Sequence, residues 1–168
     1  LAKIAGIEMC WSYNRQYDTK YLSVMPTNLF GPGDNYNLET SHVLPALMRK
    51  IHLAKMASNG DVDGIVHDEK VHSKLPLDYR KQLITACEHK HMLPIDVWGT
   101  GLPKRELMYS EDMAEACLYL INLPEAQYQQ LLVPDEKNTL APIINVGLGE
   151  DISIEELTKL IAAVVGYD

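Results

Sequence analysis

One histidine in the sequence stands in a position suited to proton transfer. His42 follows a glycine-containing loop at residues 27–35 and precedes a segment whose apolar residues have helical spacing. Because imidazole titrates nearest to neutral pH, a histidine at such a loop end could donate a proton to a bound substrate. Lys3 lies between apolar neighbours that also have helical spacing. From this periodicity alone, Lys3 is a lysine at the edge of a buried face that extends its ammonium group into water.

Three cations could bind a phosphate group, although residues of this kind are more often simply solvated. They are Arg49, Lys50 and Arg105, whose donors form charge-assisted hydrogen bonds with phosphate oxygens. Trp98 precedes a Gly-Thr-Gly segment at residues 99–101. Its indole could stack on a planar ring, or it could fill the core, which is the more usual place for tryptophan. The segment is not a dinucleotide-binding fingerprint, since it lacks the third glycine and a helix directly after it.

The elements that must hold these residues alternate between helices and strands. Apolar spacing predicts helices at residues 1–17, 41–51, 77–89, 110–123 and 153–166, and strands at 21–25, 94–98 and 143–146, the first and last of them buried. Ser41 is the expected N-cap of the second helix, and Ser153 with Glu156 forms the expected capping box of the last. The alternation indicates an α/β fold with a mostly parallel sheet.

Two segments lie between these elements. The loop at residues 27–35 is expected to leave the carboxyl end of a strand, which is the edge of an open α/β sheet where ligands bind. Residues 58–93 have a looser, charged pattern, and we interpret them as a surface insertion. The helical spacing begins at Leu1, with no preceding residue to cap the helix and no initiator methionine, so we expect a piece of a longer polypeptide.

Composition excludes several classes of protein. The 168 residues are 46% apolar, which suffices to bury a core and argues against disorder. Fifteen basic and 23 acidic residues give a net charge of −8, so binding to nucleic acid or anionic lipid by bulk charge is not expected. The three cysteines and the scattered histidines have no metal-ligand spacing, and no apolar run is long enough to span a membrane. We expect a soluble, cytoplasmic protein without a metal site.

Five blocks of sequence, taken in order, resemble a known family. The blocks are Leu1–Ile7, Ser12–Tyr17, Val24–Pro32, Ser41–Leu47, and Trp98–Gly101 with Arg105 and Glu106. Together they resemble the GDP-L-fucose synthase family, which belongs to the extended short-chain dehydrogenases/reductases. The resemblance implies an incomplete Rossmann-type parallel sheet with part of a smaller substrate-binding domain.

The resemblance also implies a division of the chain. Residues 1–33 would be a helix and strand of the cofactor domain, and residues 34–106 a substrate-binding part with the insertion at 58–93. Residues 107–150 would return to the cofactor domain, and residues 151–168 would begin a C-terminal segment of the substrate domain.

The family's site residues carry over to matching positions of this sequence. Lys3 matches the lysine of a Tyr-x-x-x-Lys pair and His42 matches the family's catalytic acid, so both are expected to be catalytic and to contact the cofactor. The nicotinamide of NADP would lie against Pro26, Thr27, Asn28 and Leu29. The GDP-sugar substrate would be held by Lys50, Trp98 and Arg105. The tyrosine of the pair would fall two positions before Leu1, and the family's cofactor loop is not in the sequence.

The activity implied by the resemblance is the NADPH-dependent epimerisation and reduction of GDP-4-keto-6-deoxy-mannose to GDP-L-fucose by a homodimer. Lys50 stands where many relatives have arginine, which keeps the charge but loses the bidentate fork. Two alternatives stay open. One is another extended short-chain dehydrogenase acting on a nucleotide sugar, which the Ser-His-Val segment at residues 41–43 disfavours. The other is a catalytically dead interaction fragment, and we expect the 168-residue chain alone to be inactive.

Overall fold

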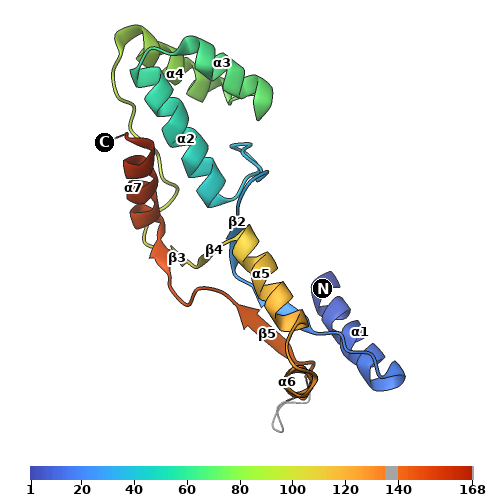
Figure 1. The fold of residues 1–168 in the computed structure, drawn as a ribbon. Coiled ribbons are helices and arrows are strands. Elements are labelled where there is room, and N and C mark those ends of the chain that lie inside the picture. Colours follow the sequence, from blue (N-terminus) through green and yellow to red (C-terminus); the bar gives the residue numbers. More distant parts are fainter. Residues whose placement is uncertain (135–139, 168) are drawn as a thin grey trace. The chain divides into compact units, whose positions relative to one another are not determined.

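The computed structural model describes residues 1–134 and 140–167 (Figure 1). The helices are α1 (Ala2–Tyr17), α2 (Val43–Ser58), α3 (Val62–Val71), α4 (Leu77–His89), α5 (Ser110–Ile121), α6 (Glu125–Leu131) and α7 (Ile154–Val165). The strands are β1 (Ser23–Pro26), β2 (Asn28–Phe30), β3 (Lys104–Arg105), β4 (Leu107–Tyr109), β5 (Ile143–Val146) and β6 (Ile152–Ser153).

The chain divides into two compact units. The first unit comprises Leu1–Leu29 and Glu106–Glu150, and the second comprises Phe30–Arg105 and Asp151–Asp168. The chain therefore passes between units after residues 29, 105 and 150, whereas the sequence predicts divisions after residues 33, 106 and 150. The cofactor and substrate roles of these parts stay predictions.

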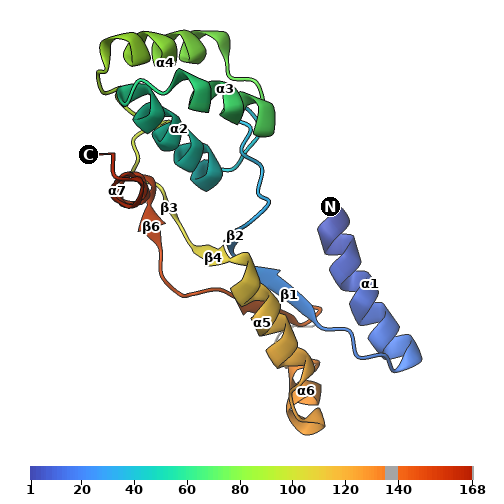
Figure 2. The ribbon, with the colours of Figure 1, turned by 45° about the horizontal axis from the view of Figure 1, so that its top comes forward.

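A parallel pair of strands forms the centre of the first unit. β1 and β5 pair in parallel, with Ser23 opposite Ile143 and Pro26 opposite Val146, and α1 and α5 lie on either side of β1 (Figure 2). Neither strand is fully buried within the described residues, since Met25 of β1 is 46% exposed and Ile143 of β5 is 40% exposed. The predicted parallel α/β arrangement is confirmed, whereas the predicted burial of these two strands is wrong.

Two further predictions, of a loop at residues 27–35 and of a strand at residues 94–98, are also wrong. The predicted loop at residues 27–35 contains β2, which pairs with β4. Residues 94–98 form no strand, because alternation of side chains does not make a strand unless a neighbouring strand supplies hydrogen bonds. A two-residue strand, β3, lies further along the chain and pairs antiparallel with β6.

The core of the second unit includes residues that were expected to lie on the surface. Leu53 of α2, Ile65 of α3 and Leu83 of α4 are fully buried and belong to one apolar cluster. Burial of each such side chain stabilises the fold by about 1.5–3 kcal/mol. The helices within residues 58–93 therefore pack against α2 as part of the core, and the interpretation of this stretch as a surface insertion is wrong in that respect.

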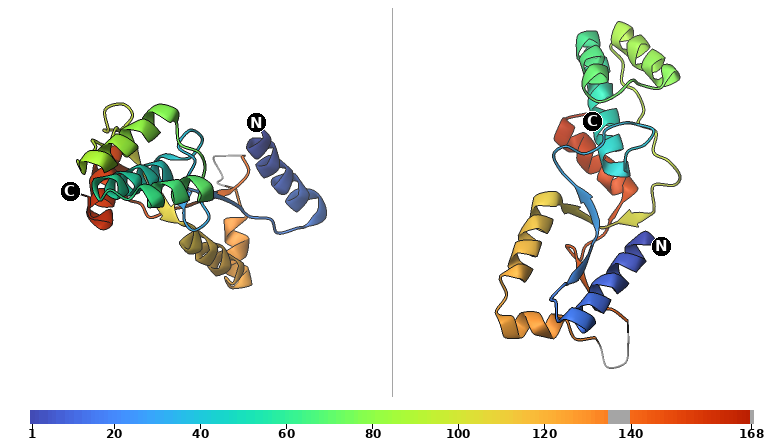
Figure 3. Two further views of the ribbon diagram at one scale, coloured as in Figure 1. Left: turned by 90° about the horizontal axis from the view of Figure 1, so that it is seen from above. Right: turned by 90° about the vertical axis from the view of Figure 1, so that its right-hand side faces the viewer.

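The ends of α7 agree with the prediction, whereas the start of α2 does not. Ser153 and Glu156 form a capping box, and Gly166 ends α7 at φ 72°, a left-handed conformation that glycine adopts without strain. α7 packs along α2 (Figure 3). The N-cap of α2 is His42, which makes no side-chain capping bond. The Ser41 hydroxyl, which was expected to cap this helix, is buried without a hydrogen-bond partner. No helix in the described part of the chain is long and apolar enough to cross a membrane.

Candidate functional site

The carboxyl end of β1 leads into a small polar cluster in the first unit. The Thr27 amide donates to the Val146 carbonyl at 3.1 Å, which extends the contact between the two parallel strands by one residue. The next residue, Asn28, donates from its amide and from Nδ2 to the Glu106 carbonyl, at 3.3 and 3.1 Å. Three segments that are distant in sequence therefore meet where β1 and β5 end.

The Glu106 side chain joins the turn after β5 to this cluster. Its Oε1 accepts a hydrogen bond from the Gly149 amide at 2.7 Å. Gly147 lies so close that a Cβ at this position would overlap the Glu106 carboxylate and lie 2.5 Å from the Thr27 Cγ2 atom. The close approach thus requires glycine at position 147. The sequence analysis gave Glu106 no role, although it stands in one of the five family-like blocks.

The Thr27 hydroxyl is buried in this cluster without a hydrogen-bond partner. An unsatisfied buried polar group costs about 1–3 kcal/mol, so such a group is most often satisfied by a bound molecule or water. Pro26, Asn28 and Leu29 beside it are exposed. An orphaned hydroxyl with accessible neighbours at the carboxyl end of a parallel strand pair marks a candidate ligand-binding site, since ligands of open α/β sheets bind at that edge.

The structure places Lys3 on α1, in the same unit as Thr27, with its side chain exposed. The expectation that Lys3 lies at the edge of a buried face is wrong for the described residues, because none of the residues of α1 is buried among them. The catalytic role of Lys3 stays a prediction.

His42 is the N-cap residue of α2 in the second unit. Its backbone is extended, with φ −70° and ψ 165°, and its side chain makes no capping hydrogen bond. The imidazole is exposed and is therefore free to meet a ligand at the start of the helix.

Lys50 and Trp98 are brought together in the same unit. The Lys50 ammonium lies 5.6 Å from the centre of the Trp98 ring, and its Nζ donates to the Asp96 carbonyl at 3.4 Å. Trp98 is 81% exposed, so the more usual expectation, that it fills the core, is wrong. A cation over an exposed indole offers both charge and a stacking surface.

A hollow of about 200 Å³ adjoins the Gly-Thr-Gly segment. Its lining comes from the segment around the glycines and from the start of α7, namely Val97, Gly99, Thr100, Gly101, Glu155, Thr158 and Lys159. The Gly101 carbonyl accepts a hydrogen bond from the Glu155 amide at 2.9 Å, which holds the segment against α7. Arg105 does not line this hollow; it is exposed on β3, and its guanidinium donates to the Lys104 carbonyl at 2.7 Å.

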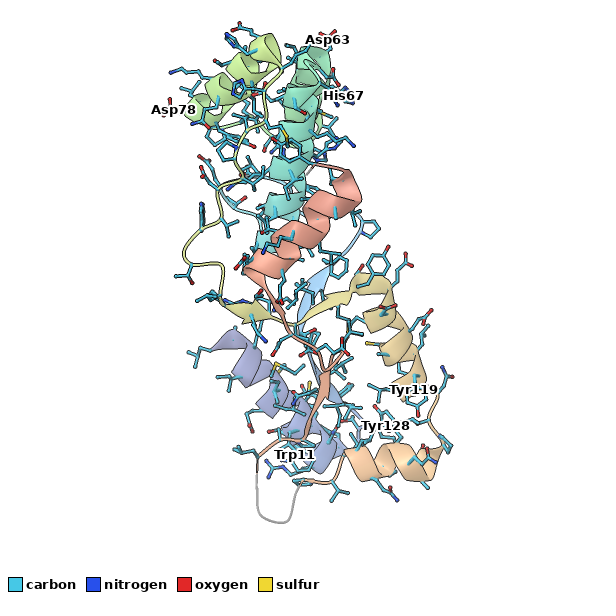
Figure 4. All side chains as sticks on the ribbon, turned by 90° about the vertical axis from the view of Figure 1, so that its left-hand side faces the viewer. Trp11, Asp63, His67, Asp78, Tyr119 and Tyr128 are labelled. Atoms are coloured by element: carbon cyan, nitrogen blue, oxygen red, sulfur yellow. The ribbon has the colours of Figure 1, made fainter. Side chains whose placement is uncertain are left out.

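The remaining candidate cation, Arg49, has a different role from the one expected. It is 3% exposed and pairs with Asp68, so the expectation of a surface cation available to phosphate is wrong. Within residues 1–134 and 140–167, no three His, Cys, Asp or Glu side chains are grouped to hold a metal ion. His67 and Asp63 lie on α3, and Asp78 lies on α4 (Figure 4).

Comparison with known proteins identifies relatives along almost the whole chain. Residues 1–66 and 67–133 match the model of the NAD dependent epimerase/dehydratase family. The chain is 38% identical over 167 residues to GDP-L-fucose synthase from Escherichia coli (strain K12), a match that covers 99% of this chain and 40% of that protein. The chain therefore spans about two fifths of the length of this curated relative.

Two solved structures have the same fold over 99% of this chain and 46% of their own length. A GDP-6-OMe-4-keto-L-xylo-heptose reductase from C. jejuni gives a TM-score of 0.75 at 34% identity. A GDP-D-glycero-L-gluco-heptose synthase from Campylobacter jejuni, crystallised in the presence of NADPH, gives a TM-score of 0.73, also at 34% identity. These matches confirm the family resemblance and the incomplete Rossmann-type α/β fold that the sequence predicts.

Proposed function

Because the chain belongs to the NAD dependent epimerase/dehydratase family, we propose that it forms part of an enzyme that converts GDP-4-keto-6-deoxy-mannose to GDP-L-fucose with NADPH. The proposal rests on the Thr27 hydroxyl, which lies without a hydrogen-bond partner at the carboxyl end of the parallel strand pair. The chain that contains it matches a GDP-L-fucose synthase over 167 residues. This activity, with its substrate and cofactor, is proposed for the whole protein and not for this chain alone.

The first unit would meet the cofactor. NADPH, when bound, supplies the hydride that reduces C4 of the sugar. The residues at the end of β1 and just after it would line the nicotinamide. The unpaired Thr27 hydroxyl would form a hydrogen bond with the carboxamide, and Pro26, Asn28 and Leu29 would lie beside it. The Lys3 ammonium would bind the nicotinamide ribose and lower the pKa of a tyrosine placed one helical turn before it, because a nearby positive charge favours the phenolate.

The second unit would bind the sugar nucleotide and supply an acid. Epimerisation next to a ketone needs a base that removes an α-proton and an acid that returns a proton to the opposite face of the ring. We assign the acid to His42, which is exposed at the start of α2 and would also contact the cofactor. Lys50 and Arg105 would neutralise the diphosphate, and Trp98, which already carries the Lys50 ammonium on its ring, would offer the substrate a stacking face.

The test is an assay of the whole protein with its proposed substrate. NADPH oxidation, followed at 340 nm, should depend on GDP-4-keto-6-deoxy-mannose, and the product should be GDP-L-fucose by chromatography and NMR spectroscopy. A protein that is folded by circular dichroism and that binds NADPH, but turns over none of this substrate, would contradict the proposal.

A second candidate is reduction of a GDP-linked 4-keto-heptose. It is favoured by the TM-score of 0.75 to a GDP-6-OMe-4-keto-L-xylo-heptose reductase. Parallel assays with deoxyhexose and heptose substrates would distinguish the two, since the enzyme should have the higher kcat/KM for its own substrate.

We also propose that the whole protein is a cytoplasmic homodimer. Support comes from the exposed apolar residues on α1, which include Ile4, Met9, Tyr13 and Tyr17, because exposed apolar faces of this kind are commonly covered by a second subunit. The three cysteines are unpaired, as is usual in a reducing compartment. Light scattering should report twice the mass of one chain, and a monomer at all concentrations would contradict the dimer.

A further inference from the structure

The buried guanidinium of Arg49 ties together three segments of the second unit. Its Nε and Nη2 donate to Oδ2 of Asp68 on α3, at 2.9 and 2.7 Å. Nη1 donates to the Tyr36 carbonyl at 3.0 Å and to the Ser73 hydroxyl at 2.7 Å, and Nη2 donates to the Ser73 carbonyl at 2.6 Å. The planar fork of donors thereby fixes α3 and the segment after it against the loop that precedes α2.

Hydrogen bonds within that loop connect Tyr36 to the start of α2. Residues on both sides of Tyr36 bond each other, since the Asn37 amide donates to Oδ1 of Asn35 at 3.0 Å. The Asn37 carbonyl in turn accepts from the Ser41 amide at 2.8 Å. Arg49 thus binds the Tyr36 carbonyl, and the carbonyl of the next residue, Asn37, binds the Ser41 amide. His42 directly follows Ser41.

A second contact joins α3 to the same loop. The imidazole of His72 lies 4.9 Å from the Tyr36 ring, and its Nε2 lies 3.9 Å from Oδ1 of Asp68. Asp68 thus faces Arg49 with one oxygen and His72 with the other, and both partners contact Tyr36.

A buried ion pair of this kind needs an explanation other than stability. Replacement of such a pair by well-packed apolar residues is often neutral or stabilising, because burial removes both charges from water. A fork of hydrogen bonds, unlike an apolar contact, fixes the position of the atoms that it joins. The position fixed here is that of the loop leading to His42.

We infer that Asp68 is a positioning residue for His42 and acts through Arg49 and the Tyr36 carbonyl. The inference rests on the proposed function, in which His42 is the acid of the epimerisation. It gives the helices of residues 58–93 a role in the reaction, because Asp68 and Ser73 both come from this stretch.

The experiment compares Asp68→Asn and Arg49→Lys with a matched core variant in the whole protein. Asp68→Asn keeps one acceptor oxygen without the charge, and Arg49→Lys keeps the charge without the fork. Leu157→Ala removes a buried apolar side chain of α7 and lowers stability without removing any hydrogen bond of the tether. Two rates are measured: hydrogen exchange of the amides of residues 37–42 by mass spectrometry, and incorporation of solvent deuterium into the sugar.

In both tether variants, the amides of residues 37–42 should exchange faster than in wild type. Deuterium incorporation into the sugar should fall about tenfold to 100-fold, since a displacement of about 1 Å at a catalytic group can cost about 100-fold. Reduction of an already epimerised ketone and KM should change little. The Leu157→Ala variant should show neither effect.

The inference and the proposed function fail in different ways. If wild type incorporates no deuterium into the sugar, the proposed function fails, and the tether is then judged by amide exchange alone. Amides that stay as protected in Asp68→Asn as in wild type overturn the inference. It is equally overturned if Leu157→Ala slows deuterium incorporation as much as the tether variants do at the same loss of melting temperature.

Discussion

Adding one methyl group at position 147 should destabilise the protein, whereas the same change at position 6 should stabilise it. In Gly147→Ala, the new Cβ overlaps the Glu106 carboxylate and lies 2.5 Å from the Thr27 Cγ2 atom. Ordinary carbon contacts are about 3.5–4.0 Å, so these side chains must move by about 1 Å. Overpacking of this size costs about 1–3 kcal/mol. The same movement separates Glu106 from the Gly149 amide.

Gly6 provides the matched control. It lies within α1, and a Cβ there would meet nothing within 4 Å. Alanine in a helix interior is more stable than glycine by about 0.5–1 kcal/mol, because glycine loses more conformational freedom on folding. The two substitutions therefore add the same atom with opposite expected signs.

Urea denaturation followed by circular dichroism measures both effects. The midpoint should fall for Gly147→Ala and rise for Gly6→Ala, with the slope m unchanged. In the whole protein, Gly147→Ala should also weaken NADPH binding in calorimetry, because it displaces Thr27. A neutral or stabilising Gly147→Ala would show that the close packing of the cluster described here does not exist.

Two other predictions concern titratable groups. Hydrogen bonds from the Ser153 hydroxyl and amide lower the pKa of Glu156 below its usual value of 4.5, so its contribution to stability is present above about pH 4.5 and is lost as the pH falls through the lowered pKa. Acid titration of the melting temperature should therefore be less steep for Glu156→Gln than for wild type, and equal slopes would contradict the capping box. Burial raises the pKa of the Cys87 thiol, so Cys87 should react with a maleimide more slowly than the partly exposed Cys10 and Cys117. Peptide mapping identifies the labelled thiols, and labelling of Cys87 first would contradict its burial.

Two elements agree with the bounds that local sequence predicts. The bounds of α4 and β5 are those predicted, 77–89 and 143–146, because apolar spacing and turn residues act over a few positions. On α5, four apolar residues with helical spacing are partly covered in the structure: Met113, Ala116, Cys117 and Leu120. Ile121, at the end of the helix, is 71% exposed.

Features that depend on distant partners could not be predicted in this way. The role of Arg49 depends on Asp68, which lies 19 residues further along the chain. No local sequence pattern predicts a buried ion pair between them. β2 was interpreted as loop because its partner, β4, lies far along the sequence. Long-range pairing is a property of the folded chain rather than of a sequence window.

The candidate site was predictable only in its residue types. Thr27 and Asn28 were identified through the family-like block, and the structure places them in one cluster with Val146. Glu106 was missed, because its role arises only when the turn at Gly149 folds over the end of β1. A glycine-rich turn directly after a strand was the available signal.

The role of His42 as the acid of a nucleotide-sugar epimerisation can be tested with His42→Gln in the whole protein. The exposed helix-start position tolerates a polar side chain, so the variant should fold. Incorporation of solvent deuterium into the sugar should slow by about 100-fold to 10,000-fold, the usual contribution of general acid–base catalysis. Reduction of an already epimerised ketone should change far less. Equal slowing of deuterium incorporation and hydride transfer, with a raised NADPH dissociation constant, would assign His42 to cofactor binding and contradict its role as the acid.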